Sequence, residues 1–187
     1  MDRLDVEKAS EEHFARIQRA ALMLTGNPWD ADDLAQEVFL MFAERYDRFE
    51  GLSSLYTWLY GILLNLVRRD RRRRGTFRQK LQVLWGNEFQ KPTSTPAAET
   101  RIEVAEWKKS LWSYVAQLPD GQREALVLRF SEHLRYEEIA QAMDCPLGTV
   151  KSRIFHGLST LRELLNRDGV DATEIPKFPC EDIRHAV

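Results

Sequence analysis

The stretch that most constrains the fold runs from Tyr136 to Leu165 and predicts two short helices joined by a tight turn. Its first part repeats apolar residues with the spacing of one buried helix face: Tyr136, Ile139, Ala140 and Met143. Its second part repeats them along one side again: Val150, Ile154, Leu158, Leu161 and Leu165. Between the parts, Pro146 interrupts the pattern, because proline lacks a backbone donor and disfavours helical geometry in the residue before it. The spacing therefore predicts a helical hairpin.

The side of the second helix opposite its apolar stripe is small and polar, with Ser152, His156 and Ser159. Basic Lys151 and Arg153 flank this side. A DNA-binding helix–turn–helix needs such a face, because its second helix enters the major groove, where base edges take polar contacts and phosphates attract cations. Spacing alone leaves a second interpretation open, in which the hairpin belongs to another helical bundle and the basic residues simply face solvent.

The composition is that of an ordinary globular protein, but its charge is unevenly distributed. The 187 residues are 43% hydrophobic and 30% charged, with a formal net charge of −2, so no global basic charge indicates nucleic-acid binding. Residues 68–74 nevertheless hold six arginines against one aspartate, whereas residues 28–37 hold four acids and no base. This asymmetry predicts two partner surfaces, one of them for an anion.

The sequence gives no sign of secretion or membrane insertion. Cys145 and Cys180 are far apart and lack metal-site spacing, which favours a reduced intracellular protein. The N-terminal segment is acidic and lacks the apolar run of a secretory signal. The longest apolar run, residues 58–67, has about half the length of a membrane-spanning helix. We therefore expect a cytoplasmic location and no membrane insertion.

Helical periodicity extends over most of the chain, and no stretch alternates long enough to predict a strand. The expected helices are about 10–25, 30–46, 54–74, 100–117, 120–131, 136–143 and 147–166. We expect an all-α fold of two small helical domains joined by a flexible linker. The predicted boundaries are residues 1–74 for the first domain, 75–99 for a linker with a short helical segment near 77–85, 100–167 for the second domain and 168–187 for a loose C-terminal tail.

The third of these helices is the most regular, and Ser53 or Ser54 is expected to cap its start. A wide apolar stripe predicts its core-facing side: Leu55, Trp58, Leu59, Ile62, Leu63, Leu66 and Val67. The other positions are expected on its surface: Thr57, Tyr60, Gly61, Leu64 and Asn65. The arginine run is expected at its C-terminal end, where cations suit the helix dipole.

Taken together, the two halves resemble the extracytoplasmic-function (ECF) class of bacterial sigma factors, the shortest members of the sigma-70 family. Residues 33–51 and 56–65 are similar to region 2 of that family, and residues 118–130 and 136–155 are similar to region 4. Two unrelated motifs in the expected order and separation make the resemblance more specific than a single helix–turn–helix.

The resemblance implies a division of roles between the two regions. Region 2 would dock on core RNA polymerase and hold the separated −10 promoter strand, and region 4 would read the −35 element. The residues implied for polymerase docking are Asp33, Gln36 and Glu37. Those implied around the −10 strand are Arg48, Phe49, Glu50, Gly51, Leu52, Ser53, Ser54, Tyr56 and Asn65. Those implied for −35 readout are Thr149, Lys151, Ser152, Arg153, Phe155 and His156.

Other residues bear on these assignments. Beside a strand-binding loop, Arg68, Arg69 and Arg72 are expected to contact phosphates rather than only to solubilise a helix end. Lys151 and His156 stand where the family commonly has arginine. Because arginine binds guanine through a fork that lysine lacks, the −35 preference is expected to differ from the common one.

The acids of residues 28–37 have competing interpretations. Asp33, Gln36 and Glu37 could form a solvated helix face, and Asp30, Asp33 and Glu37 share a side that could bind a metal ion. Hard cations require several oxygen ligands in close geometry, however, and no second cluster supplies them.

We expect a promoter-specificity subunit that binds core RNA polymerase and promoter DNA, not an enzyme, with no cofactor and no metal. The resemblance alone implies an anti-sigma factor as a further partner. Two other hypotheses remain open. A self-sufficient dimeric helix–turn–helix regulator would bind a palindromic operator without polymerase. A metal-dependent nucleic-acid enzyme using the acids between residues 30 and 37 would lose activity with a chelator.

Overall fold

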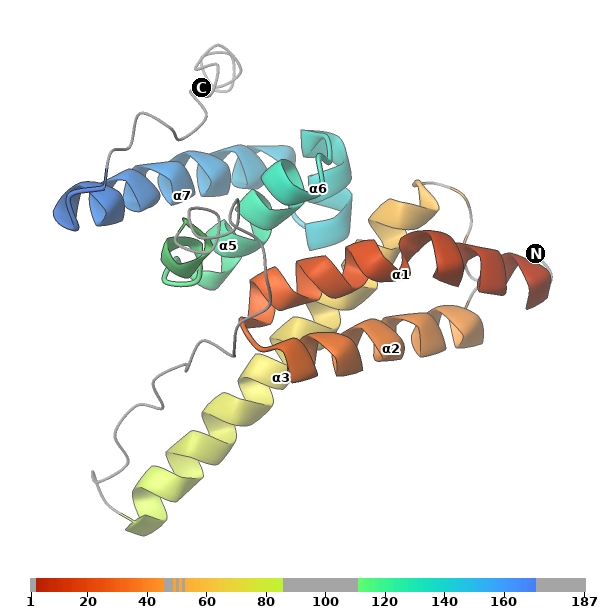
Figure 1. Cartoon of the computed structure of the whole chain (residues 1–187), viewed down its shortest axis with the longest axis horizontal. Helices are drawn as coiled ribbons and strands as arrows, with labels where there is room; N and C mark the ends of the chain where they lie inside the picture. Colours follow the sequence, from red (N-terminus) through yellow and green to blue (C-terminus); the bar gives the residue numbers. More distant parts are fainter. Residues whose placement is uncertain (1–2, 46–48, 50, 52, 86–110, 171–187) are drawn as a thin grey trace. The chain divides into compact units, whose positions relative to one another are not determined.

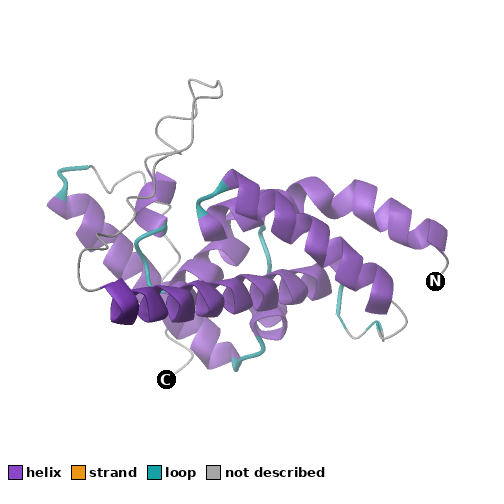
Figure 2. Cartoon of the chain, turned by 90° about the horizontal axis from the view of Figure 1, so that it is seen from below, coloured by secondary structure: helices purple, strands orange, loops and turns teal. Residues whose placement is uncertain are grey.

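The computed structural model describes residues 3–45, 49, 51, 53–85 and 111–170 (Figure 1). Over these residues every regular element is a helix (Figure 2), which confirms the expected all-α fold. The chain divides into two compact units, Met1–Thr100 and Arg101–Val187, each with its own hydrophobic core. The predicted boundaries of linker and tail stay predictions, because residues 86–110 and 171–187 lie outside the described part.

The first unit is built on a hairpin of α1 (Arg3–Thr25) and α2 (Pro28–Arg45), which lie side by side (Figure 1). Gly26 turns the chain with a φ of +70°, a conformation that glycine adopts without strain. Asn27 caps the start of α2, since its Oδ1 accepts a hydrogen bond from the backbone N–H of Trp29 at 3.0 Å. Gly26 and Asn27 therefore form a tight connection between α1 and α2.

The third helix, α3 (Leu55–Trp85), packs against both α1 and α2. Ser54 caps it as expected, because its Oγ accepts a hydrogen bond from the backbone N–H of Thr57 at 3.1 Å. Its expected end at the arginine run is wrong, since the helix continues through Gly75 to Trp85. Arginine is a good helix former, and one glycine costs only about 1 kcal/mol, so nothing in the local sequence stops the helix. The arginine run therefore lies inside the helix, not at its dipole end.

Two further expectations about the first unit need correction. Thr57, Tyr60 and Leu64 were expected on the surface of α3 but are buried. Both α1 and α2 pack against α3. Together they cover side chains that a single neighbouring helix would leave exposed to solvent. In addition, α1 begins at Arg3 rather than near Ser10.

The second unit contains helical residues 111–115, α5 (Asp120–Leu126), a π-helical turn η3 (Val127–Ser131), α6 (Tyr136–Met143) and α7 (Leu147–Arg167). α6 has the predicted bounds, and α7 ends one residue later than predicted. α7 packs against both α5 and α6. Its predicted apolar stripe is buried throughout: Val150, Ile154, Leu158, Leu161 and Leu165.

The ends of α6 are fixed by local hydrogen bonds. At its start, the backbone N–H of Arg135 donates to Oε2 of Glu138 at 2.8 Å, which is half of a capping box. At its end, Asp144 takes a left-handed conformation with a φ of +51°. The next N–H, of Cys145, then donates to the carbonyl of Ala140 at 3.1 Å. These contacts set the direction in which α7 leaves the turn.

Candidate DNA and polymerase interface

The outer face of α7 carries most of the predicted −35 readers. Ser152 and His156 are exposed, and Phe155 is 49% exposed. The side chains of Thr149 and Lys151 are half-buried beside them. The ring of Phe155 lies edge-on to that of His156 at 5.4 Å. The helix therefore presents a mixed polar and apolar strip on the side opposite its buried stripe.

Arg153 differs from the other predicted readers because it is engaged within the second unit. Its Nη1 donates a hydrogen bond to Sγ of Cys145 in the α6–α7 turn at 3.7 Å. Its guanidinium also covers Gly121 of α5, where an added Cβ would lie 3.1 Å from Nε. Arg153 thus links α7 to the turn and to α5, a role that its place in the sequence did not indicate.

The start of α6 is held by a cation from the preceding turn. Arg129 donates a hydrogen bond through Nη1 to the carbonyl of Leu134 at 3.0 Å. The same guanidinium lies 4.8 Å from the ring centroid of Tyr136, within the range of a cation–π interaction. This contact fixes the connection between η3 and α6, and so the helix that supports α7.

On α2, the predicted docking residues share a face with apolar residues that we did not single out. Asp33 and Gln36 are exposed. Trp29 is 80% exposed and Leu40 is 65% exposed, and the steps of four, three and four residues place all of these on one side of the helix. The signal was present in the sequence, since their spacing places Trp29 and Leu40 beside Asp33 and Gln36, but the prediction named neither residue.

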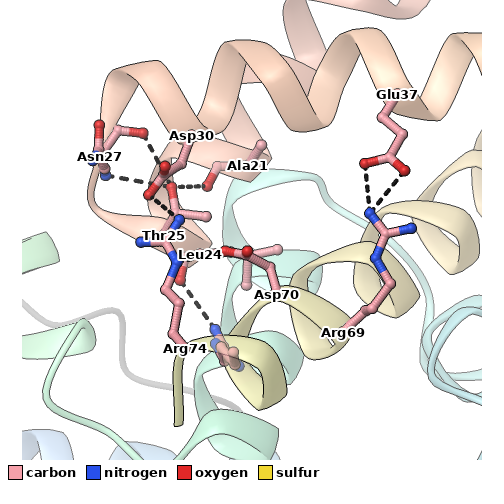
Figure 3. Close-up of polar contacts among 10 residues, drawn as sticks. Ala21, Leu24, Thr25, Asn27, Asp30, Glu37, Arg69, Asp70 and Arg74 are labelled. Atoms are coloured by element: carbon pink, nitrogen blue, oxygen red, sulfur yellow. Dashed lines mark hydrogen bonds and ion pairs between the residues drawn. The ribbon is translucent and has the colours of Figure 1, made fainter. Parts of the chain in front are cut away.

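Glu37, the third predicted docking residue, contacts an arginine predicted to bind DNA. Nη2 of Arg69 lies 2.7 Å from Oε1 and 2.6 Å from Oε2 of Glu37 (Figure 3). The pair joins α2 to α3 across 32 positions of sequence. No local pattern could have indicated it.

Two other arginines of the run also contact the α1–α2 hairpin. Arg74 pairs with Asp30 at 2.7 Å and with Asp70 at 2.8 Å, and the hydrogen bond to Asp30 raises the pKa of Arg74 above its ordinary value. Arg71 donates to the carbonyl of Leu24 at 3.0 Å, at the end of α1. Arg69, Arg71 and Arg74 thus each contact the hairpin.

These pairs weigh against the metal hypothesis. Asp30 and Glu37 each contact a guanidinium, which neutralises charge that a cation would need. Among the described residues, no three His, Cys, Asp or Glu side chains are grouped closely enough to hold a metal ion.

The loop residues predicted around the −10 strand are only partly described. Arg48, Glu50 and Leu52 lie outside the described residues. Phe49 is half-buried, with its ring 5.5 Å from that of Trp58. Trp58, expected in the core, is itself half-buried, with its ring 5.8 Å from that of the buried Phe42.

Other loop residues show how the chain enters α3. Gly51 is exposed with a φ of +71°, Ser53 is half-buried, and the Ser54 hydroxyl serves as the helix cap. The positive φ of Gly51 bends the chain before α3, in a conformation that glycine adopts without strain.

Tyr56 lies in an aromatic and cationic cluster between α1 and α3. The guanidinium of Arg16 is 3.7 Å from its ring centroid, and the ring of His13 is 5.5 Å away. The hydroxyls of Tyr56 and Tyr60 are hydrogen-bonded at 2.5 Å. Because Tyr60 is fully buried, it cannot stack on a base.

The remaining predicted −10 residues follow one face of α3. Asn65 and Arg72 are exposed, and Arg68 is half-buried. The spacing of three and four residues places them on a common side of the helix. This side is distinct from the one on which Arg71 and Arg74 contact the hairpin.

The first unit packs three helices together, and the second contains a helix–turn–helix whose second helix buries its apolar side. This combination is that of a helical DNA-binding protein. Comparisons with known proteins give its family. The model of "Sigma-70 region 2" matches residues 10–77, and that of "Sigma-70, region 4" matches residues 108–161. The ECF RNA polymerase sigma factor EcfG of Rhodopseudomonas palustris is 36% identical over 83% of this chain and 82% of its own length. The RNA polymerase sigma-H factor of Pseudomonas aeruginosa is 36% identical over 73% of each chain.

Solved structures agree with the sequence comparisons. The sigma factor RpoE of Bartonella quintana, crystallised with the anti-sigma factor NepR, superposes with a TM-score of 0.69. The two chains are 27% identical over 88% of this chain and 98% of that one. CnrH, solved with the cytosolic domain of CnrY, shares the fold with a TM-score of 0.66 at 20% identity, over 89% and 91% of the two chains. The chain belongs to the sigma-70 family and is an RNA polymerase sigma factor of the ECF class.

The described helices include no candidate for a membrane span. None of those in residues 3–45, 55–85 and 111–167 combines the length and apolar character needed to cross a bilayer.

Proposed function

We propose that this sigma factor selects promoters by placing α7 in the −35 major groove while the first unit captures unpaired −10 bases. The observation that carries the proposal is the two-sided character of α7. Val150, Ile154 and Leu158 are buried, whereas Ser152 and Phe155 on other sides of the helix are exposed. A recognition helix needs this division, because one face must pack on its own domain while the other fits the groove.

The exposed strip of α7 has the chemistry that groove readout requires. Lys151 and His156 can donate to phosphates or base acceptors, and Ser152 can contact several bases. The partly exposed ring of Phe155 suits contact with a thymine methyl group. Arg153, held by Cys145 and by the surface of α5, would act mainly by fixing the position of α7.

For the −10 element, the proposed surface is the outward face of α3 and the loop before it. Arg68, Arg72 and Asn65 would contact the backbone of the displaced strand, together with Tyr56 and residues 48–54. Extruding a base from the duplex costs a few kcal/mol, which contacts to the flipped base and its phosphates would offset. Contacts from arginine to phosphate would make this step salt-dependent.

The proposed polymerase-docking surface is the exposed face of α2. Asp33 and Gln36 supply polar contacts there, and Trp29 and Leu40 add exposed apolar area at either end. Aromatic residues surrounded by polar ones are typical of the residues that dominate protein interfaces. The partner side should therefore be basic, with an apolar recess for the indole ring.

The remaining parts of the proposal follow from the family. The protein would act in the cytoplasm as a stoichiometric specificity subunit without catalytic residues or a cofactor. The complex of the Bartonella quintana relative with NepR supports regulation by an anti-sigma protein. The linker and tail, residues 75–99 and 168–187, are proposed to connect and flank domains 1–74 and 100–167.

Run-off transcription with purified core RNA polymerase over a promoter library tests the proposal. We expect specific initiation only when the sigma factor and core enzyme are both present, with enrichment of two sequence elements around −35 and −10. Tight binding to a palindromic duplex without polymerase, together with no stimulation of initiation, would instead support a self-sufficient regulator. Initiation lost on chelation of a metal bound by the sigma factor itself would support the metal hypothesis.

A further inference from the structure

Arg16 of α1 lies over an aromatic ring at the first turn of α3. Its guanidinium carbon is 3.7 Å from the ring centroid of Tyr56, within the range of a cation–π interaction. At this separation the two planar groups are stacked face to face, because an approach by an N–H edge would hold the carbon farther away. Tyr56 follows the capping residue Ser54 by two positions. The stack therefore borders residues 48–54, the loop that the proposed function gives to the unpaired −10 strand.

The ring of Tyr56 is held in place by contacts from both helices. Its hydroxyl is hydrogen-bonded to that of the buried Tyr60 at 2.5 Å, and the two rings meet edge-on at 4.5 Å. From α1, the ring of His13 lies 5.5 Å away. Tyr56 is therefore a fixed support, and the orientation of the guanidinium that stacks on it is set before any ligand arrives.

The face of Tyr56 under Arg16 is closed to a base, because the guanidinium already covers it. The planar group that remains on this side of the ring is the guanidinium itself. Unpaired bases stack on arginine guanidinium planes as they do on aromatic rings, and the positive charge adds attraction for phosphate. Arg16 is half-buried, so part of its side chain reaches solvent.

We propose that Arg16 stacks on one unpaired base of the displaced promoter strand, with Tyr56 as the inner layer of the stack. This inference rests on the proposed function and adds α1 to the surface that holds the strand. Tyr56 is then a positioning residue, because it contacts Arg16 rather than the base. About two and a half helical turns separate Tyr56 from Asn65, so these two residues lie on opposite sides of α3. The Arg16 site is therefore separate from the outward face of α3 and receives a base on the α1 side of the loop.

Two other roles for Arg16 make different predictions. As a structural link between α1 and α3, it would stabilise the first unit and affect every nucleotide of a bound strand alike. As a phosphate contact alone, it would act through its charge and not through its planar shape, so lysine would replace it. As a platform for a base, it affects one nucleotide and requires the plane.

The test uses the complex of the full-length protein with purified core RNA polymerase. Its ligand is a fluorescein-labelled single-stranded oligonucleotide that carries the −10 element selected from the promoter library. Each nucleotide in turn is replaced by an abasic residue, which removes the base and keeps the phosphate. Arg16→Ala should weaken binding of the intact oligonucleotide about fivefold or more. It should also abolish the loss of affinity that the abasic residue causes at one position, and at that position only.

Further variants separate the plane from the charge and the support from the platform. Arg16→Lys keeps the charge, so it should abolish the same abasic effect while leaving the salt dependence of binding unchanged. Tyr56→Leu removes the supporting ring and should act like Arg16→Ala, whereas Tyr56→Phe keeps the ring and should retain the abasic effect. Lys8→Ala removes an exposed cation from the same helix and should leave the whole abasic pattern as in the wild type.

Each abasic effect compares two oligonucleotides on the same protein, so partial unfolding of a variant does not change it. An unaltered abasic pattern in Arg16→Ala, uniformly weaker binding at every position, or a wild-type pattern in Arg16→Lys would overturn the proposal. Wild-type transcription distinguishes this failure from failure of the proposed function. If the wild type initiates specifically but no position depends on Arg16, only the Arg16 site is lost, whereas absence of specific initiation removes both.

Discussion

Arg153 donates a hydrogen bond from Nη1 to Sγ of Cys145 at 3.7 Å, so the recognition helix is tied to the turn from which it begins. The sequence placed Arg153 among the residues that read the −35 element. Under our proposal, its contacts with Cys145 and with the surface over Gly121 give Arg153 mainly a positioning role, beside exposed neighbours on α7. Substitutions at Arg153 and at its neighbours Lys151 and His156 separate positioning from readout.

Lys151→Ala and His156→Ala are expected to lower discrimination between matched and mismatched −35 sequences. Each removes a donor from the outer strip of α7, and a base-specific contact is worth about 1–3 kcal/mol of discrimination. The measurement is transcription with core polymerase from promoters that differ only at −35. Equal responses of matched and mismatched promoters would contradict our assignment of the groove-facing strip.

Arg153→Ala should act differently from Lys151→Ala. Because it removes the contacts with Cys145 and the surface over Gly121, it should weaken protection of the α6–α7 turn in hydrogen exchange. Affinity should fall for matched and mismatched −35 sequences alike. If Arg153→Ala changed the preferred sequence while leaving exchange of the turn unaltered, direct readout by Arg153 would be the better explanation.

Gly157→Ala should destabilise the second unit relative to Gly148→Ala. A Cβ at Gly157 would lie 3.1 Å from Cδ1 of Leu126 and 3.3 Å from Cβ of Gln122, whereas one at Gly148 meets nothing within 4 Å. Both substitutions gain helix propensity, but only the first overpacks the α5–α7 contact, a cost of about 1–3 kcal/mol. Denaturant unfolding followed by hydrogen exchange of α7 measures the difference. Equal stabilities would show that α5 can shift without cost.

Glu138→Gln should reduce the acid sensitivity of α6. Hydrogen bonds from the side chain and backbone of Arg135 lower the pKa of Glu138 below its ordinary value of 4.5. A carboxylate with a lowered pKa stabilises the folded state above the unfolded-state pKa, and that stabilisation is lost as pH falls through the folded-state value. Hydrogen exchange of α6 amides between about pH 5 and pH 3 should thus lose less protection in the variant.

Glu137→Gln supplies the control for that experiment, because Glu137 lies exposed in the same first turn. It should retain the acid sensitivity of the wild type. Identical pH profiles for wild type and Glu138→Gln would mean that the capping box contributes nothing to the pH dependence of α6.

Asp33→Ala combined with Gln36→Ala should weaken binding to core polymerase and leave helix content unchanged. Both side chains are exposed on α2 and carry no part of the core. Loss of polar interface contacts should cost about 1 kcal/mol or more, which is at least a fivefold change in affinity. Size-exclusion co-elution and a titration with core enzyme measure it. Unchanged affinity would refute a docking role for these residues.

Asp30→Ala is the matched comparison on the same helix. Because Asp30 pairs with Arg74, its loss should lower the stability of the first unit rather than remove a docking contact. An effect of Asp30→Ala on polymerase affinity as large as that of the double variant, at unchanged stability, would place the docking surface on the other side of α2.

Several features of the fold could be predicted from the sequence. Periodicity and breakers predicted the helical class and the bounds of α6 and α7, and the buried stripe of α7 follows directly from its spacing. Ser53 or Ser54 was expected to cap α3, because a short hydroxyl before an apolar run is a local signal, and Ser54 is the cap. Local interactions of this kind act within a few residues, and the sequence displays them directly.

Other features of the fold and site could not be predicted in this way. Spacing showed one apolar side of α3, but burial of Thr57, Tyr60 and Leu64 depends on the presence of two neighbouring helices. Most of the predicted −35 residues lie on the side of α7 opposite its buried stripe, as their spacing predicted, yet the engagement of Arg153 depends on where α5 lies. Periodicity reports which side of a helix is apolar, not how many partners surround it.

By itself, the sequence determined the helical class, the two family motifs and the helix–turn–helix, because each depends on residues close together in the chain. Only the tertiary structure determined which acidic side chains the arginines of residues 68–74 contact. Arg69 pairs with Glu37 and Arg74 with Asp30 because packing brings α3 against α2, and charges that meet across a helix interface leave no periodic signal in either segment.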